Sequence, residues 1–150
     1  LQQRKGGCDL IVVDYLNMLD SRPGRNETLE QVIASNIRAL KALAMEIGCP
    51  VLVLAQMNRN IETRSDKMHV PMLSDLRDAG TIEQVADCVF FVYNPSRHGI
   101  KEDARTGESL EGVGKLIVAT TRNGSTGVAK YRYNKTMTRL FSDPVLFRTV

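Results

Sequence analysis

An amphipathic segment between two short apolar runs is the feature that most constrains the fold of this chain. Its large apolar residues recur at intervals of three and four, which is the spacing of one face of an α-helix; they are Leu29, Val32, Ile33, Ile37, Leu40, Leu43, Ala44 and Ile47. Asn26 can cap this helix, and Gly48 followed by Pro50 can stop it. The segment therefore predicts one long helix between residues 26 and 48.

Four short runs of apolar residues predict β-strands. They are continuous rather than alternating, as in strands that are covered on both faces within a parallel sheet; the runs are 10–13, 51–55, 88–92 and 116–119. The first two flank the helix, and strand–helix–strand is the pattern of a crossover between parallel strands. We therefore expect an α/β fold in which the sheet is partly parallel and helices cover both of its faces.

The last third of the chain predicts antiparallel strands. The sequence RNGSTG, residues 122–127, separates an apolar run from VAKYRY, residues 128–133, in which alternate side chains change character. Asn-Gly between such runs is typical of a tight hairpin turn. A further short strand is expected near residues 139–141, so the sheet should end in antiparallel strands.

The composition is that of one soluble globular domain. The chain has 150 residues, of which 43% are hydrophobic and 25% charged, and this length can bury a sizeable core. No run approaches the roughly 18 apolar residues of a membrane span, and no signal-peptide pattern is found. Cys8, Cys49 and Cys88 are far apart and predict buried, reduced thiols rather than a disulfide framework or a zinc site. We therefore expect a cytoplasmic protein with a single domain over residues 1–150.

The charge is unevenly distributed, and this favours an anionic partner. The net charge is +3, but residues 97–150 contain 10 Lys and Arg against 5 Asp and Glu. Solvated basic faces are also common, so the indication is a weak one.

Two polar segments, 58–80 and 95–114, are expected to be loops. Structureless loops longer than about 15 residues are usually functional or disordered, which makes both segments candidates for contacting a partner.

Polar residues follow three of the expected strands: Asp14, Gln56 and Arg122. In an open parallel sheet, ligands bind outside the carboxyl ends of the strands, so these residues could converge on a nucleotide. The carboxylate can hold hydrated Mg²⁺, the amide can sense a terminal phosphate, and the guanidinium can stabilise transferring charge. Each also has a purely structural interpretation. Asp14 could form a turn, the amide of Gln56 could close a strand end, and Arg122 could be a solvated arginine in a hairpin.

Other catalytic motifs are absent from the sequence. It contains no phosphate loop of the form G-x-x-x-x-G-K-[ST] and no G-x-G-x-x-G that opens a helix after a strand. His69 and His98 are isolated in expected loops, where neither metal ligation nor a catalytic triad is indicated. A set of acids is expected on a solvated loop face: Glu102, Asp103, Glu108 and Glu111.

Four motifs resemble those of the DnaB-type replicative helicases. They are LIVVDYLNML at 10–19, PVLVLAQMNR at 50–59, LSDLRDAGTIEQVAD at 73–87 and RNGSTG at 122–127, in the order and with the spacing of that family. The resemblance extends from residue 8 to about residue 143, and the third motif is highly specific. It implies the C-terminal part of a RecA-like motor domain, which is a P-loop NTPase core.

The resemblance implies that three residues act on ATP and Mg²⁺. Asp14 would be the Walker B aspartate, which contacts Mg²⁺ through water, and Gln56 the polar residue that senses the γ-phosphate. Arg122 would be the arginine finger, which acts in trans on ATP bound to the adjacent subunit. Members of the family often carry a lysine two positions before this arginine; here Thr120 stands in its place, so one cation is missing.

The resemblance also implies partners. Arg77, Asp78 and Gly80 would belong to the loop that lines a ring's central channel and contacts single-stranded DNA. Backbone amides and one arginine can grip phosphates without reading bases, which suits a translocating motor. The structural alternative is a helix-capping turn before residues 81–86, and the two interpretations are compatible. Further expected partners are copies of the chain in a homohexamer, and a primase and a helicase loader that bind parts outside these residues; no membrane partner is expected.

The N-terminal part of the motor domain is expected to be missing from these residues. It would carry the phosphate loop, whose lysine and amides hold the β- and γ-phosphates. We therefore expect the full-length protein to be an ATP-hydrolysing DNA helicase that unwinds duplexes by translocating on single strands, and the chain alone to be inactive. Two alternatives remain open: a degenerate, non-catalytic RecA-like module that binds DNA or a ring, and another RecA-like ATPase such as a recombinase, against which the third motif argues.

Overall fold

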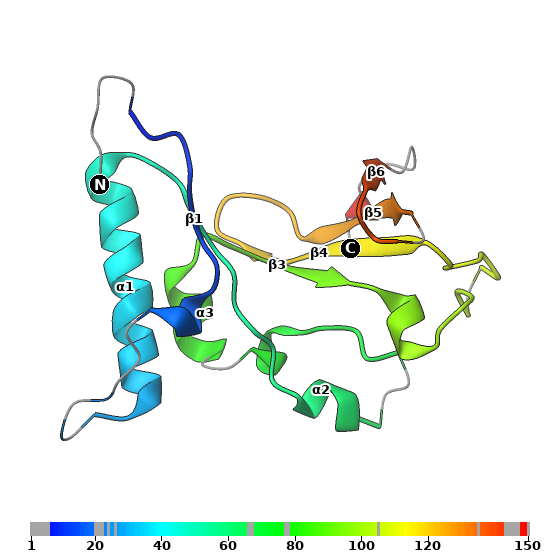
Figure 1. Cartoon of the computed structure of the whole chain (residues 1–150), viewed down its shortest axis with the longest axis horizontal. Helices are drawn as coiled ribbons and strands as arrows, with labels where there is room; N and C mark the ends of the chain where they lie inside the picture. Colours follow the sequence, from blue (N-terminus) through cyan, green and yellow to red (C-terminus); the bar gives the residue numbers. More distant parts are fainter. Residues whose placement is uncertain are drawn as a thin grey trace. The chain divides into compact units, whose positions relative to one another are not determined.

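The computed structural model describes a chain that divides into two compact units. The described residues are 7–19, 23, 25, 27–65, 68–76, 79–104, 106–134, 136–142 and 148–149. Unit 1 consists of Leu1–Asn58 and Leu76–Ala86, and unit 2 of Arg59–Asp75 and Asp87–Val150. Figure 1 shows the path of the chain. A single domain over residues 1–150 stays a prediction.

Unit 1 contains the strand–helix–strand element that the sequence predicts. β1 (Ile11–Val13) and β2 (Val51–Val53) pair in parallel, with Ile11 opposite Val51. The connection between them is the long helix α1 (Leu29–Ile47), which is cyan in Figure 1. The crossover between parallel strands is therefore confirmed.

Local sequence sets both ends of α1. The Thr28 side chain accepts a hydrogen bond from the backbone N–H of Gln31 at 3.3 Å, and the Gln31 side chain accepts one from the backbone N–H of Thr28 at 2.9 Å. This reciprocal pair is a capping box. Gly48 ends the helix at a φ of 62°, which glycine adopts without a steric penalty. The predicted stop is confirmed, but the cap is Thr28; Asn26 lies outside the described residues.

Two short helices complete unit 1. η1 (Leu16–Met18) is a 3₁₀ helix that follows β1, and the backbone N–H of its buried first residue donates to the carbonyl of Leu54 at 2.8 Å. α3 (Ala79–Val85) contacts α1. Among the residues that the structure describes, no helix is long and apolar enough to cross a membrane.

Unit 2 is built on an antiparallel sheet of five strands. The order is β3-β4-β5-β6, and β7 also pairs with β5 (Figure 1). The strands are β3 (Cys88–Tyr93), β4 (Val113–Thr121), β5 (Gly127–Tyr133), β6 (Leu140–Ser142) and β7 (Arg148–Thr149). β4 and β5 form the hairpin predicted around residues 122–127, and β6 lies where a short strand is expected. Both predictions are confirmed.

The prediction that residues 88–92 and 116–119 form parallel strands is wrong. β3 and β4 are antiparallel, and the residues of β3 alternate between a buried and an exposed face. The exposed face is itself apolar, because it carries Cys88, Phe90 and Val92. An apolar residue at every position conceals the two-residue period, so the run resembles a strand covered on both faces.

The two segments expected to be long loops contain short helices. In unit 2 these are α2 (Asn60–Thr63), η2 (Leu73–Asp75) and η3 (Pro95–His98). The hydroxyl of buried Tyr93, at the end of β3, donates to the carbonyl of Met68 and so ties the first segment to the sheet. The expectation of a long loop is therefore wrong for segment 58–80. In segment 95–114, the described residues between η3 and β4 contain no helix or strand beyond the isolated bridge of Glu102 with Ser109.

The cysteines differ in part from the prediction. All three are free thiols, as expected. Cys49 is buried, but Cys8 and Cys88 are exposed. Cys8 precedes β1, and Cys88 is the first residue of β3 on its open face. The prediction of three buried thiols is therefore wrong for these two, because a place beside an apolar run does not by itself bury a side chain.

Candidate functional site

Asp14 and Gln56 follow the two paired strands of unit 1. Asp14 comes directly after Val13, the last residue of β1, and Gln56 lies a short way beyond Val53, the last residue of β2. Val13 and Val53 are opposite each other in the parallel ladder. The structure therefore brings two of the predicted site residues to the same edge of one sheet, at its carboxyl end.

The backbone on either side of Asp14 is fixed to the segment that follows β2. The N–H of Leu54 donates to the carbonyl of Val13 at 2.9 Å, and the N–H of Leu16 donates to the carbonyl of Leu54 at 2.8 Å. Leu16 is buried and only 3% exposed, so it anchors the chain just beyond the aspartate. The peptide bond between Asp14 and Tyr15 is cis. Asp14 itself is exposed at the end of this rigid turn.

Asp14 and Gln56 present an exposed carboxylate and an exposed amide. Neither side chain has a hydrogen-bond or ion-pair partner within the described part of the chain. Protein-bound Mg²⁺ usually keeps several waters and uses one or two carboxylates together with substrate phosphates. One carboxylate fits this mode of binding. It does not fit an all-protein metal cage, and the described residues contain no group of three or more His, Cys, Asp or Glu that could hold a metal.

Arg122 belongs to unit 2 and follows β4 at the start of the hairpin turn. Its backbone N–H donates to the carbonyl of Asp87 at 2.9 Å, and its Nε lies 3.7 Å from Oδ1 of Asp87. The two side chains are 52% and 63% exposed, so this ion pair is solvated and the guanidinium is accessible. The convergence of Arg122 with Asp14 and Gln56 stays a prediction.

The residues expected to contact DNA are described in part. Arg77 and Asp78 lie outside the described residues. Gly80 is exposed in the first turn of α3, where an added Cβ would meet nothing within 4 Å. Leu76, just before them, is buried and forms an antiparallel bridge with Met57. α3 begins at Ala79, so Gly80 lies inside a helix rather than in a turn before residue 81; a helix-capping turn formed by Arg77 and Asp78 stays a prediction, as does contact with DNA.

The sequence did not reveal a buried ion pair in unit 2. Nη1 of Arg64 lies 3.3 and 3.1 Å from the carboxylate oxygens of Asp75, and the side chains are 23% and 10% exposed. Nη2 of Arg64 donates to the carbonyl of Val70 at 2.6 Å, and Asp75 accepts from the N–H of Met72 at 2.9 Å. These bonds join Arg64 to Val70 and Asp75, and Asp75 to Met72. Mixed charges in a polar segment usually indicate a solvated surface, so the pattern gave no signal of burial.

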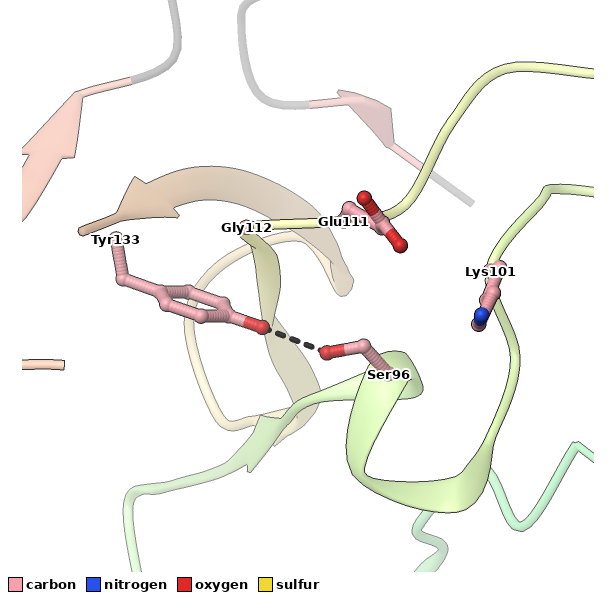
Figure 2. A pocket seen from close by; sticks show the side chains of 5 residues that line it. All are labelled: Ser96, Lys101, Glu111, Gly112 and Tyr133. Carbon is pink, nitrogen blue, oxygen red and sulfur yellow. Dashed lines mark hydrogen bonds between the residues drawn. The ribbon is translucent and has the colours of Figure 1, made fainter. Parts of the chain in front are cut away.

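A cavity of about 320 Å³ lies in unit 2 beside the end of β5. It is lined by Ser96, Lys101, Glu111, Gly112 and Tyr133 (Figure 2). Figure 2 shows the hydroxyls of Ser96 and Tyr133 meeting, 2.7 Å apart. Each hydroxyl oxygen also lies 2.9 Å from Oδ1 of Asn94, so the three oxygen atoms share the two hydroxyl protons. None of the predicted site residues lines this cavity.

His69 and His98 are neighbours rather than isolated residues. Their ring centroids are 5.2 Å apart, and the ring of His98 stacks on that of Tyr93 at 5.8 Å. Nδ1 of His69 lies 2.7 Å from the carbonyl of Ile61. The pair packs around the buried end of β3, which is a structural use of both rings.

The chain is similar to replicative helicases over most of its length. It matches the family described as DnaB-like helicase C terminal domain over residues 1–142. The replicative DNA helicase DnaB of Leifsonia xyli is 41% identical over 143 residues, which are 95% of this chain and 29% of that protein. The DnaB of Geobacillus stearothermophilus is 35% identical over 133 residues, 89% of this chain and 28% of that protein. The chain thus spans less than a third of the length of these relatives.

Two solved structures share its fold. One is described as an ATPase domain; its TM-score is 0.77 at 29% identity, covering 93% of this chain and 46% of that one. The other is described as a DnaB-like replicative helicase and its interactions with primase, with a TM-score of 0.76 at 30% identity, covering 92% of this chain and 32% of that one. The predicted α/β, RecA-like fold is confirmed. The chain therefore belongs to the DnaB-like helicase C terminal domain family.

Proposed function

We propose that this chain supplies part of the ATP site and the DNA-contacting loop of an ATP-dependent replicative DNA helicase. The observation that carries the proposal is the placement of Asp14 and Gln56 beyond the paired carboxyl ends of β1 and β2. Ligands of open α/β sheets bind at this edge. The relatives that match nearly the whole chain, each named as a replicative DNA helicase, support the choice of reaction.

Asp14 and Gln56 have separate tasks in this proposal. Bound Mg²⁺ would neutralise charge on the β- and γ-phosphates of ATP. The exposed carboxylate of Asp14 would accept hydrogen bonds from waters of that ion and so fix its position. The Gln56 amide can donate to a γ-phosphate oxygen and accept from the attacking water, which orients that water for in-line attack.

Arg122 would act on ATP held by a neighbouring copy in a homohexameric ring. Its ion pair with Asp87 is solvated and contributes at most about 1 kcal/mol, so this contact holds the guanidinium only weakly. The residue two positions before Arg122, Thr120, is uncharged, so a second positive charge at that phosphate would come from elsewhere or be absent. Arg122→Ala should abolish hydrolysis, and mixing it with a variant unable to bind ATP should restore some activity. A complete failure to restore activity would exclude action in trans.

We propose that the polymer bound by the protein is single-stranded DNA. Arg77 and the backbone amides near Gly80 would contact its phosphates, and Asp78 would orient Arg77 and these amides. Arg77→Ala should weaken binding similarly for all sequences and reduce the slope of log affinity against log salt by about one unit. A loss confined to some sequences would contradict phosphate gripping.

A primase is a further proposed partner, because one of the similar structures is described as a helicase and its interactions with primase. A helicase loader is proposed beside it.

The test of the ATP site is DNA-stimulated hydrolysis by the natural gene product that contains this chain. Asp14→Asn should lower kcat on the order of 100-fold, because it removes a charge that positions the metal. Asp9→Asn is the matched control, since Asp9 is an exposed aspartate at the other end of β1. Equal losses in both variants would assign the effect to strand β1 rather than to the site. DNA binding without any hydrolysis in the unaltered protein would favour the degenerate, non-catalytic module.

A further inference from the structure

Cys8 and Cys49 come together where β1 and β2 begin. Each precedes its strand by two or three residues, and the strands pair with Ile11 opposite Val51. The N–H of Ile11 donates to the carbonyl of Pro50 at 3.0 Å, so the pairing continues toward the cysteines. Neighbouring strands lie about 4.8 Å apart. Disulfides join Cα atoms roughly 4.4–6.8 Å apart, so this end of the sheet has suitable dimensions.

The two thiols also interact directly. Burial of Cys49, which is 3% exposed, raises the pKa of its thiol, and a hydrogen bond with the Cys8 side chain raises it further. The Cys8 Sγ lies 3.4 Å from the carbonyl of Leu10, and the Cys49 Sγ 3.6 Å from the carbonyl of Pro50. Both sulfurs are therefore held at the same end of β1 and β2, and the raised pKa favours the thiol form of Cys49.

We propose that Cys8 and Cys49 form an intramolecular disulfide under oxidising conditions, which makes them a redox modification site of unit 1. The pair lies at the amino ends of the two strands, whereas Asp14 and Gln56 follow their carboxyl ends. The proposal rests on the positions of the two thiols and does not depend on ATP hydrolysis. It also revises the expectation that distant cysteines exclude a disulfide, because a parallel crossover brings together residues that are far apart in the sequence.

Because Cys8 is exposed and Cys49 is buried, Cys8 reacts with the oxidant first. Exposed Cys8 meets the oxidant, and its thiolate attacks hydrogen peroxide to give a sulfenic acid and water. The sulfur of Cys49 then attacks the Cys8 sulfur, and the sulfenic oxygen leaves as water after taking the proton of Cys49. Two thiols and one peroxide thus yield one disulfide and two waters, and two electrons pass from sulfur to oxygen.

The bond would close residues 8–49 into a covalent loop that contains the whole of α1. A cross-link of this length restricts the unfolded chain and stabilises the folded one. It would also hold β1 and β2 together at their amino ends. The expected measurable effect is a higher midpoint of thermal unfolding for unit 1 after oxidation, which a thiol reductant reverses.

The experiment oxidises the natural gene product with hydrogen peroxide, then blocks free thiols and maps peptides without reduction. A peptide pair joined through Cys8 and Cys49 is expected, with Cys88 blocked as a free thiol. Cys88→Ser is the matched control, because Cys88 is also exposed but lies in unit 2; it should leave the disulfide intact. Cys49→Ser should instead leave Cys8 as a sulfenic acid that a dimedone probe traps.

Repeating the oxidation in urea tests whether the disulfide forms because the fold holds the two sulfurs close together or because they meet at random in the unfolded chain. The disulfide should form on the order of tenfold faster in the folded protein, because the fold holds the sulfurs together. Equal rates in urea, a Cys8–Cys88 bond, or dimers linked through Cys8 would overturn the proposal. Over-oxidation of Cys8 with Cys49 left as a thiol would overturn it as well.

Discussion

At the scale of single residues, Gly114 and Tyr131 show how strand pairing constrains a side chain. They are opposite each other in the ladder between β4 and β5. A Cβ on Gly114 would overlap the ring of Tyr131, so the ring occupies the space that glycine leaves over the strand. Burial raises the pKa of the Tyr131 hydroxyl, and the neighbouring Tyr133 raises it further. This tyrosine is therefore held in its neutral form by the fold.

Tyr131→Phe should reduce the loss of stability at alkaline pH. The raised pKa means that the folded state keeps a proton which the unfolded chain, with a tyrosine pKa of about 10, gives up. The free energy of unfolding therefore falls as the pH rises above about 10 and continues to fall until the folded-state pKa is passed. Phenylalanine cannot ionise, so urea unfolding at about pH 8 and about pH 11 should differ less in the variant. The control is Tyr15→Phe, which removes an exposed tyrosine. The same change in both variants would contradict burial as the cause.

The sequence alone predicted the positions of some polar residues in the structure but not of others. The positions of Asp14 and Gln56 could be predicted, because a polar residue after an apolar run lies at a sheet edge once the two strands pair in parallel; their role in an ATP site stays a prediction. The ion pair of Arg64 with Asp75 could not be found in this way. Its partners are ordinary charged residues within a polar segment, and only the packing of that segment decides which charges are buried.

At the scale of elements, the sequence predicted the features that depend on nearby residues, but the direction in which β3 pairs with β4 was predicted wrongly. α1 follows from apolar spacing with a glycine stop, and the β4–β5 hairpin follows from Asn-Gly between two runs. Both signals involve residues close together in the chain. The direction of β3 relative to β4 depends on contacts between distant segments, and an apolar run is compatible with either direction.

Removing one partner of the Arg64–Asp75 ion pair should destabilise the segment 64–75. Asp75→Ala leaves a largely buried guanidinium without its carboxylate and frees the N–H of Met72, so we expect a loss of about 2–4 kcal/mol in unfolding free energy. Urea unfolding measures this loss. Replacing both partners by apolar residues should cost less, because no charge is then left unpaired.

The control for this prediction is the more exposed ion pair of Lys130 with Glu108. Its atoms are closer, at 2.6 Å, but its side chains are 23% and 42% exposed. Glu108→Ala should therefore cost at most about 1 kcal/mol. Equal losses for Asp75→Ala and Glu108→Ala would contradict the view that burial, rather than distance, decides what each pair contributes.

At the scale of the whole molecule, the proposed ATP site has a carboxylate and an amide from this chain but no phosphate loop. The sequence contains no G-x-x-x-x-G-K-[ST], whose lysine and amides would hold the β- and γ-phosphates. Asp14 carries the same sign of charge as the triphosphate, so it attracts ATP only through a metal ion that lies between them. Two exposed side chains and a bridging metal supply few of the contacts that a nucleotide site needs.

The 150-residue chain on its own should therefore neither bind ATP tightly nor hydrolyse it. Titration with Mg-ATP in a calorimeter should give a dissociation constant weaker than about 1 mM, since no amide nest or lysine neutralises the phosphates. Phosphate release should stay at the level of a buffer blank, with or without single-stranded DNA. The Asp14→Asn chain serves as the control. Magnesium-dependent turnover that this substitution abolishes would show that these residues form a complete site, and would overturn the prediction.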